Sequence, residues 1–424
     1  MVTVSFVIAI ISWLLPFLIT LTKNKVNLTH PIVIFPLFVV FTLCVPFSEY
    51  LFAWSNKFEF RGLRYISTEI IGDGGGAYVR ANFYMGVSAV FYFFGIYLKN
   101  AKKLLPREQD FITIQNYNFS KSSKQFFIFI FLIPILTLPL FLFGYSDAGT
   151  YFIYIISTFI YFIPAVLAFF NLTAFIIAFA VVIPLLFIVL SKGNIFYLFL
   201  WALIPFDFLR GNNFKRVLIG LMGLLIGIIL MNKMIEARAD KGFEASTDDV
   251  NFIYTFFYRE YGFDGFAGDV YNSINDEKTK GTSYILTNVK ELMPAKVHEF
   301  VFNKPKIRYG NLIGFEVYKE DKHSEAGTGF QRYFLLDFYH DFGFLGIPII
   351  SFIYGWGMMF WYRKNITLYI KTLNRLYLVK YVTLCFNLHF LVNGLLYYAI
   401  TTFIGMNLLV FIFQFLTNRK SHLS

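Results

Sequence analysis

The feature that most constrains this chain is a long stretch without any charge. Residues 151–190 contain no Asp, Glu, Lys or Arg. A helix needs about 20 apolar residues to cross the hydrocarbon core of a bilayer, so this stretch is long enough for two such helices. The same bias runs through the whole chain, in which only 15% of residues are charged and 57% are hydrophobic, against about 25% charged residues in a soluble protein. The sequence therefore predicts an integral membrane protein.

Eleven apolar segments are candidate membrane spans, and together they predict an all-α, polytopic fold. They cover residues 3–22, 31–53, 82–99, 125–145, 150–171, 173–191, 194–209, 214–232, 337–362, 377–395 and 396–416. The first span lacks a basic leader and a small-residue cleavage site, so we interpret it as a retained span rather than a signal peptide. The chain then divides into eight spans in residues 1–232, one large polar loop at 233–336, and three spans with a short tail in 337–424.

Basic residues between the spans predict the orientation, because Lys and Arg are enriched in cytoplasmic loops. The linker after the third span and the linker at 363–376 are both rich in Lys and Arg. An odd number of predicted spans separates each linker from the loop 233–336. That loop and the amino terminus are therefore expected outside, and the carboxyl terminus is expected in the cytoplasm. The net charge of +11 is then explained by orientation and by anionic headgroups rather than by a nucleic-acid partner.

Several kinds of chemistry are disfavoured by the sequence. Cys44 and Cys385 both fall in apolar segments, so a disulfide or metal framework is unsupported. No HExxH or CxxC spacing occurs, and no metal site is predicted. The run Gly-Asp-Gly-Gly-Gly at 72–76 follows no strand of a βαβ unit, so we interpret it as an external turn. Secondary transporters typically contain internal repeats. The chain shows no clear repeat of this kind, which counts against transport.

The loop 233–336 contains basic side chains that could converge on phosphate oxygens. Arginine suits this role because it presents a planar fork of donors and keeps its charge. The candidates are Arg238, Arg259, Lys304, Arg308 and Arg332. The alternative for each arginine is an ordinary surface ion pair. Arg210 is a further candidate at the end of the seventh span, but the predicted topology places it near the cytoplasmic side unless that span is broken or re-entrant.

A second group of candidates could accept a proton. His340 and Asp341 stand, with Asp337, where the ninth span is predicted to enter the membrane, and ionisable residues at such a place are functional candidates. The alternative is a polar cap on that span. His323 and Glu325 could serve as a base and the group that orients it, although exposed turn residues would look the same.

The spacing around these residues predicts one continuous helix. Arg332 and Gly343 are eleven residues apart, about three helical turns, so they are expected to share one helix face with Tyr339 between them. Gly343 and Gly346 are expected to let a neighbouring helix approach closely.

In this order, these parts resemble the Wzy-type polymerases of oligosaccharide repeat units (O-antigen and capsule polymerases) and, more distantly, the O-antigen ligases. The resemblance covers residues 190–360. It is carried by Met293-Pro294, Lys304-Pro305, Arg332 with its spacing to Gly343, Asp-Phe-Gly-Phe-Leu-Gly at 341–346, and Arg259. Ligases usually have histidine at the position of Arg332, so arginine favours the polymerases. Leu209-Arg210-Gly211 resembles the family's Ser-Arg-Gly region, with leucine in place of a small hydroxyl residue.

The resemblance implies a GT-C-like glycosyltransferase in the bacterial cytoplasmic (inner) membrane that acts without a metal or other cofactor. The donor would be a glycan on undecaprenyl pyrophosphate and the acceptor a single lipid-linked repeat unit. A chain-length regulator is a further candidate partner. Arg332 and Arg259 are expected to bind the pyrophosphate, assisted by Arg238, Arg308, Arg210, Lys304 and Tyr339. The candidates for the proton acceptor are His323, Glu325, His340 and Asp341.

Two other functions stay open from the sequence. An O-antigen-type ligase would move finished glycan to a different acceptor and leave its length unchanged. A flippase for lipid-linked oligosaccharides would transport instead, although such carriers rarely devote so long a segment to one external loop.

Overall fold

The structure is a computed structural model that describes about half of the chain. The described residues are 1–23, 29–52, 74–98, 160, 162–188, 198, 204–205, 222–223, 225–227, 229–230, 233, 262–274, 283–290, 293, 295–303, 333–394 and 396–418. All regular secondary structure among them is helical, and no strand occurs within these ranges. This confirms the all-α prediction for the described part.

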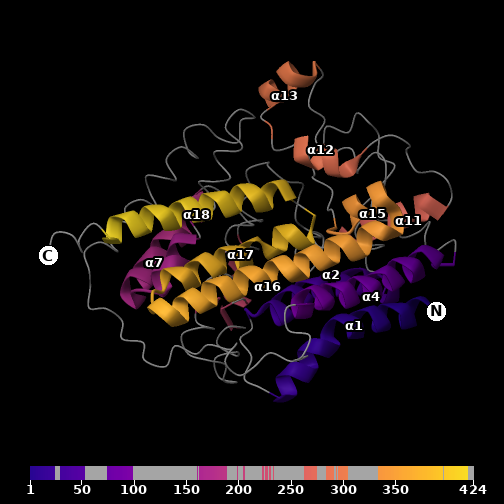
Figure 1. The fold of residues 1–424 in the computed structure, drawn as a ribbon, viewed down its shortest axis with the longest axis horizontal. Coiled ribbons are helices and arrows are strands. Elements are labelled where there is room, and N and C mark those ends of the chain that lie inside the picture. The colour runs from indigo at the N-terminus through magenta and orange to yellow at the C-terminus, as the bar shows by residue number, and fades with distance from the viewer. Residues whose placement is uncertain are drawn as a thin grey trace.

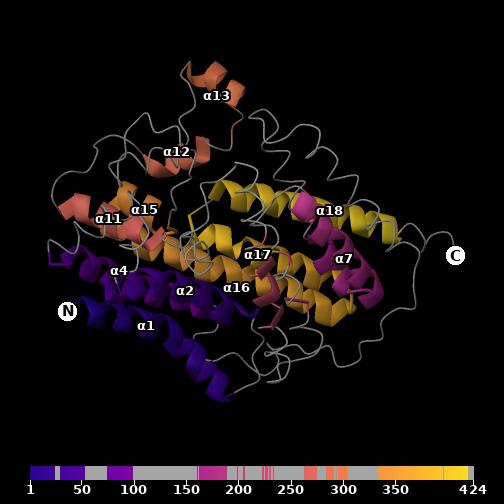
Figure 2. The ribbon, with the colours of Figure 1, turned by 180° about the vertical axis from the view of Figure 1, so that it is seen from behind.

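The helices form an elongated bundle (Figures 1 and 2). In chain order they are α1 (Val2–Lys23), α2 (Pro31–Phe52), α4 (Gly76–Tyr97), α7 (Leu172–Ile188), α11 (Gly262–Ile274), α12 (Tyr284–Lys290), α13 (Ala295–Phe302), α15 (Leu336–Phe342), the 3₁₀ helix η4 (Gly343–Leu345), α16 (Gly346–Thr372), α17 (Leu376–Val392) and α18 (Leu396–Asn418).

Three helical stretches are long and apolar enough to cross a membrane, namely Pro31–Ser48, Gly76–Tyr97 and Leu336–Thr372. Shorter apolar helices accompany them at Val2–Pro16, Leu172–Leu186, Leu376–Leu388 and Ala399–Gln414. Large apolar side chains also cover the outside of the bundle. Phe83, Val90 and Phe411 are each more than 60% exposed, a surface that lipid tails would cover and water would not. These are the features of a helical membrane protein.

The predicted spans agree with the helices at most described positions. The spans at 31–53, 377–395 and 396–416 correspond to α2, α17 and α18. The ninth differs, because α16 begins at Gly346 and continues to Thr372, through most of the predicted linker 363–376. The span at 125–145 lies outside the described residues, and 194–209 and 214–232 are described only at isolated positions. The number of eleven therefore stays a prediction.

The central contact of the bundle joins α4 to α16 through small residues. Their hydroxyl groups meet at Ser88 and Ser351, whose Oγ atoms lie 2.7 Å apart in a buried hydrogen bond. Further along, a Cβ on Gly355 would lie 2.0 Å from the carbonyl oxygen of Tyr92, and a Cβ on Gly95 would lie 2.5 Å from that of Phe352. Only glycine lets the two backbones come this close, as in other membrane helix pairs with small residues at the contact.

Aromatic rings fill the space between this pair and the first two helices. Trp13 of α1 donates its indole N–H to the carbonyl of Met85 at 3.2 Å, and its ring lies 5.3 Å from that of Tyr92. Phe35 of α2 stacks on Tyr92 at 4.8 Å. Tyr92 is fully buried and donates its hydroxyl to the carbonyl of Pro31 at 2.7 Å, so its polar atom is satisfied inside an apolar core.

The continuous helix expected from Arg332 to Gly343 is not formed. Residues 333–335 precede α15, which begins at Leu336 and ends at Phe342. Gly343 then takes φ 60°, a conformation that glycine adopts without steric cost. The close approach at Gly346 is to the preceding helix rather than to a separate one, because a Cβ there would lie 2.1 Å from the carbonyl oxygen of Phe338.

The segment predicted as the large polar loop carries three described helices, α11, α12 and α13, so these parts of it are folded. Figures 1 and 2 show α11 beside the start of α4 and α13 standing away from the bundle.

We name two opposite ends of the bundle. The loop end holds the amino terminus, the start of α4, and the helices α11, α12 and α15. There, Phe6 contacts Phe263 at 5.7 Å, and Tyr78 donates its hydroxyl to Asp264 Oδ1 at 2.8 Å. The basic end holds the start of α2 and the junction of α16 and α17. Its basic residues in the described part of the chain are Arg363, Lys364, Lys371, Arg375 and Lys380.

Candidate functional site

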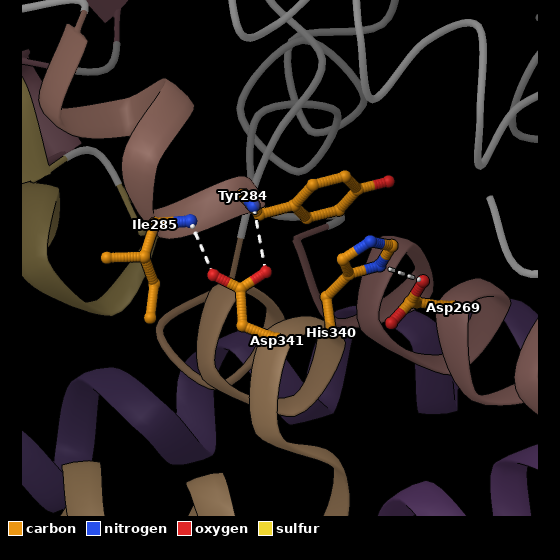
Figure 3. A network of polar contacts seen from close by, with 5 residues as sticks. All are labelled: Asp269, Tyr284, Ile285, His340 and Asp341. Carbon is orange, nitrogen blue, oxygen red and sulfur yellow. Dashed lines mark hydrogen bonds and ion pairs between the residues drawn. The ribbon is translucent and has the colours of Figure 1, made fainter. Parts of the chain in front are cut away.

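The most distinctive polar cluster is at the loop end, around His340 (Figure 3). His340 lies on α15, and its Nδ1 is 2.9 Å from Oδ1 of Asp269 on α11. The ring of Tyr284, the first residue of α12, stacks on the imidazole with centroids 3.5 Å apart and planes 2° apart. Both members of the His–Asp pair have side chains only 3% exposed. Three helices from separate parts of the chain thus enclose one imidazole ring.

The pairing determines which nitrogen of His340 is available for chemistry. An ionised carboxylate can only accept hydrogen bonds, so Nδ1 carries the hydrogen that is donated to Asp269. The other nitrogen, Nε2, makes no hydrogen bond to the described residues. A neutral His340 therefore presents a lone pair at Nε2, with the ring orientation fixed by Asp269 and by Tyr284. This is the arrangement of a general base and its orienting carboxylate.

Asp269 has capacity for a second donor. Its Oδ2 is buried and receives no hydrogen bond from the part of the chain that the structure describes. Burying an acceptor without a donor costs free energy, and such atoms in folded proteins call for a functional explanation. A carboxylate that is only half satisfied also attracts the positive charge that His340 would gain on accepting a proton.

Asp341 follows His340 in sequence but points to a different helix. Its two carboxylate oxygens accept hydrogen bonds from Ser283 Oγ at 2.7 Å, from the backbone N–H of Tyr284 at 2.9 Å and from that of Ile285 at 3.1 Å. These are among the first donors of α12, which have no partner within the helix. Asp341 thus caps α12 and holds Tyr284 against His340 (Figure 3).

Asp337, one turn earlier on α15, links the cluster to the rest of the bundle. Its Oδ2 accepts a hydrogen bond at 2.7 Å from the side-chain amide of Asn288 on α12. The same amide donates to the carbonyl of Gly394, between α17 and α18, at 3.3 Å. Asp337 and Asn288 are both buried, so α12 is fastened at both its first and its second turn.

Tyr339, a predicted substrate-binding residue, is buried at 6% exposure. Its ring lies 5.4 Å from that of Tyr84 on α4 and 5.6 Å from that of Phe266 on α11. In this position the ring packs α15 against α4 and α11, and it supports the helix from which His340 projects.

The predicted site residues divide between described and undescribed parts of the chain. His340, Asp341 and Tyr339 are described, and the structure brings them together with α11 and α12. The remaining candidates lie outside the described residues, namely Arg210, Arg238, Arg259, Lys304, Arg308, His323, Glu325 and Arg332. No group of three or more His, Cys, Asp or Glu side chains close enough to share a metal ion occurs among the residues described.

Two members of the cluster, Asp269 and Tyr284, are not among the site residues predicted from the sequence. A signal was present for Asp269, because it is one of only two acidic residues in α11, the other being Asp264, and most of the remaining residues of this helix are apolar or glycine. Nothing in the sequence marked Tyr284 among the many tyrosines of the chain.

The chain was compared with models of known protein families, with curated proteins and with solved structures, and none of them matches it.

Proposed function

We propose that this protein is a membrane glycosyltransferase that polymerises oligosaccharide repeat units linked to a polyprenyl pyrophosphate, undecaprenyl pyrophosphate in a bacterial cytoplasmic membrane. The observation that carries the proposal is the buried pair of His340 and Asp269, 2.9 Å apart, at the end of a bundle of apolar helices. A base held beside a lipid-facing surface suits a sugar hydroxyl as nucleophile and a lipid-linked sugar as donor.

Two of the four predicted proton acceptors, His340 and Asp341, lie in the described part of the chain, and the geometry favours His340 over Asp341. His340 has a nitrogen without a partner among the described residues, and its ring is fixed by Asp269 and Tyr284. Asp341 is engaged by three donors and would have to give up the cap of α12 in order to act. We therefore assign the proton to His340 Nε2 in the proposed reaction.

The reaction would proceed in one displacement at the anomeric carbon of the donor sugar. The acceptor hydroxyl oxygen forms the new glycosidic bond, and its proton passes to His340 Nε2. The bond between the anomeric carbon and the pyrophosphate oxygen breaks, and its electron pair stays on the pyrophosphate. Asp269 stabilises the imidazolium that forms, which is a contribution made mainly in the transition state.

Positive side chains would stabilise the negative charge that develops on the pyrophosphate. Arg332 and Arg259 are the side chains proposed to donate hydrogen bonds to its oxygens. Both belong to chain segments that lead into the cluster. Arg259 is three residues before Gly262, the start of α11, and Arg332 directly precedes Tyr333. The Tyr333 ring lies 5.7 Å from that of Phe263 in the first turn of α11. The described residues that follow the two arginines therefore pack against each other.

The arrangement of the two ends supports the proposed topology. The amino terminus, the start of α4 and the helices of the large loop share the loop end, and the junction of α16 and α17 lies at the basic end. The proposal places the loop end outside, and it places the basic end and the carboxyl terminus in the cytoplasm. The polypeptide would then cross the membrane eleven times.

The glycan profile of cells that lack the protein tests this function. Without it, lipid-linked single repeat units should accumulate and the ladder of polymer lengths should disappear. Wild-type protein should restore the ladder, whereas Arg332→Ala and His340→Gln should not. His298→Gln is the matched histidine control, because His298 is also buried but lies on α13, away from the cluster; it should restore the ladder.

Two results would contradict the proposal. An unchanged ladder in cells without the protein would exclude polymerisation. Polymer of full length that accumulates on its lipid carrier without the protein would indicate a ligase instead, since a ligase acts only on finished glycan.

A further inference from the structure

The imidazole of His340 is enclosed, although the proposed reaction needs it to meet a substrate. Its side chain is only 3% exposed. The ring of Tyr284 covers one face of the imidazole, with the two centroids 3.5 Å apart and the planes 2° apart. A lipid-linked sugar is far larger than a water molecule and cannot reach Nε2 through so small an opening. If His340 acts on such a substrate, an element next to its ring has to move.

Of the three helices around His340, α12 is the least buried. Residues 263–270 of α11 are all buried, and α15 buries four of its seven residues. In contrast, α12 buries only Tyr284 and Asn288, and its Leu286 is 52% exposed. Figures 1 and 2 show α12 outside α15, on the side away from α4. Because α12 buries so little apolar surface, it can leave the bundle at a lower cost in free energy than α11 or α15.

The contacts that fasten α12 include hydrogen bonds at both of its turns. At the first turn, the Asp341 carboxylate accepts three hydrogen bonds from the start of the helix. At the second turn, the side-chain amide of Asn288 donates to Asp337 Oδ2 at 2.7 Å and to the carbonyl oxygen of Gly394 at 3.3 Å. Water can replace the partner in such a contact, so the net free energy that holds it is small. These hydrogen bonds favour the docked position of α12 without making it permanent.

We infer that α12 is a lid over His340, which opens to admit the substrate and closes by placing the Tyr284 ring on the imidazole. Closure of a lid excludes water from the reacting atoms and completes the arrangement of the side chains that act on the substrate. The inference rests on the proposed function for the identity of the substrate. The movement of α12 itself can be measured without a substrate.

The rate at which a small reagent modifies His340 measures this movement. Diethyl pyrocarbonate acylates a neutral imidazole at its free lone pair, and mass spectrometry of the digested full-length protein locates the adduct. His30 is the internal reference, because it is 0% exposed and lies at the basic end, so its modification reports loosening of the whole bundle. We expect slow modification of His340 in the wild-type protein and about tenfold faster modification in Asn288→Ala, while His30 keeps its rate.

Two further variants make the test specific to the lid. Leu286→Ala shortens an exposed side chain of the same helix and should leave the His340 rate at its wild-type value. In Asn288→Cys with Asp337→Cys, at positions whose native side chains meet at 2.7 Å, a short thiol-bridging reagent such as dibromobimane should hold the lid closed. Modification of His340 should be faster than in wild type before bridging and about tenfold slower than in wild type after it. Each single cysteine variant, treated in the same way, is the control for the reagent.

The lid and the proposed function can fail separately. A His340 rate that stays the same in Asn288→Ala and after bridging would overturn the lid, even if the polymer ladder still depends on His340. Faster modification of His340 and His30 together would overturn it as well, because the whole bundle would then have loosened. If the rates change as expected and cells without the protein keep their ladder, the lid stands and the proposed function is wrong.

Discussion

Charged side chains at the two ends of the bundle contact different kinds of partner. At the loop end the acidic groups are held by partners from other helices. Asp264 accepts from Tyr78, Asp341 from the start of α12, and Asp269 pairs with His340. Each of these contacts joins residues far apart in the sequence, so the loop end is a place where polar groups fix the positions of helices.

At the basic end the cations contact aromatic rings and backbone carbonyls. Lys364 lies 5.8 Å from the centre of the Trp361 ring, and Lys380 lies 5.6 Å from that of Tyr377. Arg375 donates from Nη1 to the carbonyl oxygen of Phe169 at 3.0 Å. Such contacts orient these side chains against the helices of the basic end.

The difference indicates a division of labour along one bundle. A reaction that moves a proton needs side chains whose positions and hydrogen bonds are fixed before the substrate arrives. An end that faces the cytoplasm, as the basic end does in the proposed topology, is expected to carry an excess of positive charge.

Asp269→Asn should have the largest effect if the loop end is built for proton transfer. The Asn amide can donate to Nδ1 of His340, which would leave the hydrogen on Nε2 and remove the lone pair. We expect polymer formation by isolated membranes, supplied with lipid-linked repeat units, to fall by about 10²-fold or more.

Asp264→Asn is the matched control for this variant, because Asp264 is a buried carboxylate of the same helix whose partner is a tyrosine. Its activity should stay near that of wild type. Imidazole added to His340→Ala should restore part of the lost activity, which a purely structural role of His340 would not allow. Equal losses in the two Asn variants would remove the distinction between them.

Gly355→Ala should separate the helices that connect the two ends. The new Cβ would lie 2.0 Å from the carbonyl oxygen of Tyr92, so α4 and α16 would have to move apart. We expect the protein in detergent to lose about 2 kcal/mol or more of stability, even though alanine favours the helix by about 1 kcal/mol.

Gly357→Ala provides a control on the same helix, because a Cβ at Gly357 would meet no atom within 4 Å. It should leave the stability unchanged or raise it by up to about 1 kcal/mol. Thermal unfolding of both variants measures the difference, and effects of the same sign and size would show that the close contact of α4 and α16 is not needed.

The sequence was sufficient for the long apolar helices and insufficient for the contacts at their ends. The positions of α2, α17 and α18 follow from apolar length alone, since little else can shield a backbone in lipid. The continuous helix predicted from Arg332 to Gly343 is wrong. The spacing of these two residues suits a helix whether or not the glycine takes φ 60°, so it does not reveal the break at Gly343. Glycine permits that conformation but does not require it.

The pairing at the candidate site depends on contacts that no local pattern encodes. His340 and Asp269 are 71 residues apart in sequence, and they meet because Tyr339 packs between α4 and α11. Adjacent residues on a helix diverge by about 100°, so His340 and Asp341 reach different partners although the sequence presents them as one motif. Their separate roles become visible only once α11 and α12 are placed in space.

Asp341→Ala tests whether the loop end fixes its helices through caps. The substitution leaves Ser283 Oγ and the N–H groups of Tyr284 and Ile285 without their acceptor, and we expect a loss of about 2 kcal/mol. The first amides of α12 should then exchange hydrogen faster, while those of α17 should keep their rates. Asp341→Asn, which retains one acceptor oxygen, should give an intermediate result. Unchanged exchange in Asp341→Ala would show that α12 is held by Asn288 alone.

His30 gives the smallest effect and tests the other end. It lies just before α2, where burial and the neighbouring Arg363 guanidinium lower its pKa to about 3. Since an unfolded histidine has a pKa near 6.5, the unfolded chain binds more protons between those values, and acidification favours unfolding. Between pH 7 and pH 5.5 we expect this histidine to remove about 1 kcal/mol of stability.

His30→Asn isolates this contribution, because asparagine can still accept from the N–H of Ile32, which lies 3.2 Å from His30 Nδ1, but does not titrate. Thermal unfolding of the two proteins at pH 7 and at pH 5.5 should therefore show a smaller loss in the variant, because the two proteins differ only at this position. The same loss in both proteins would mean that protonation of His30 is tolerated beside Arg363. A protonated, buried His30 would then need a negative partner at the basic end. Such a partner would contradict the excess of positive charge that distinguishes this end from the loop end.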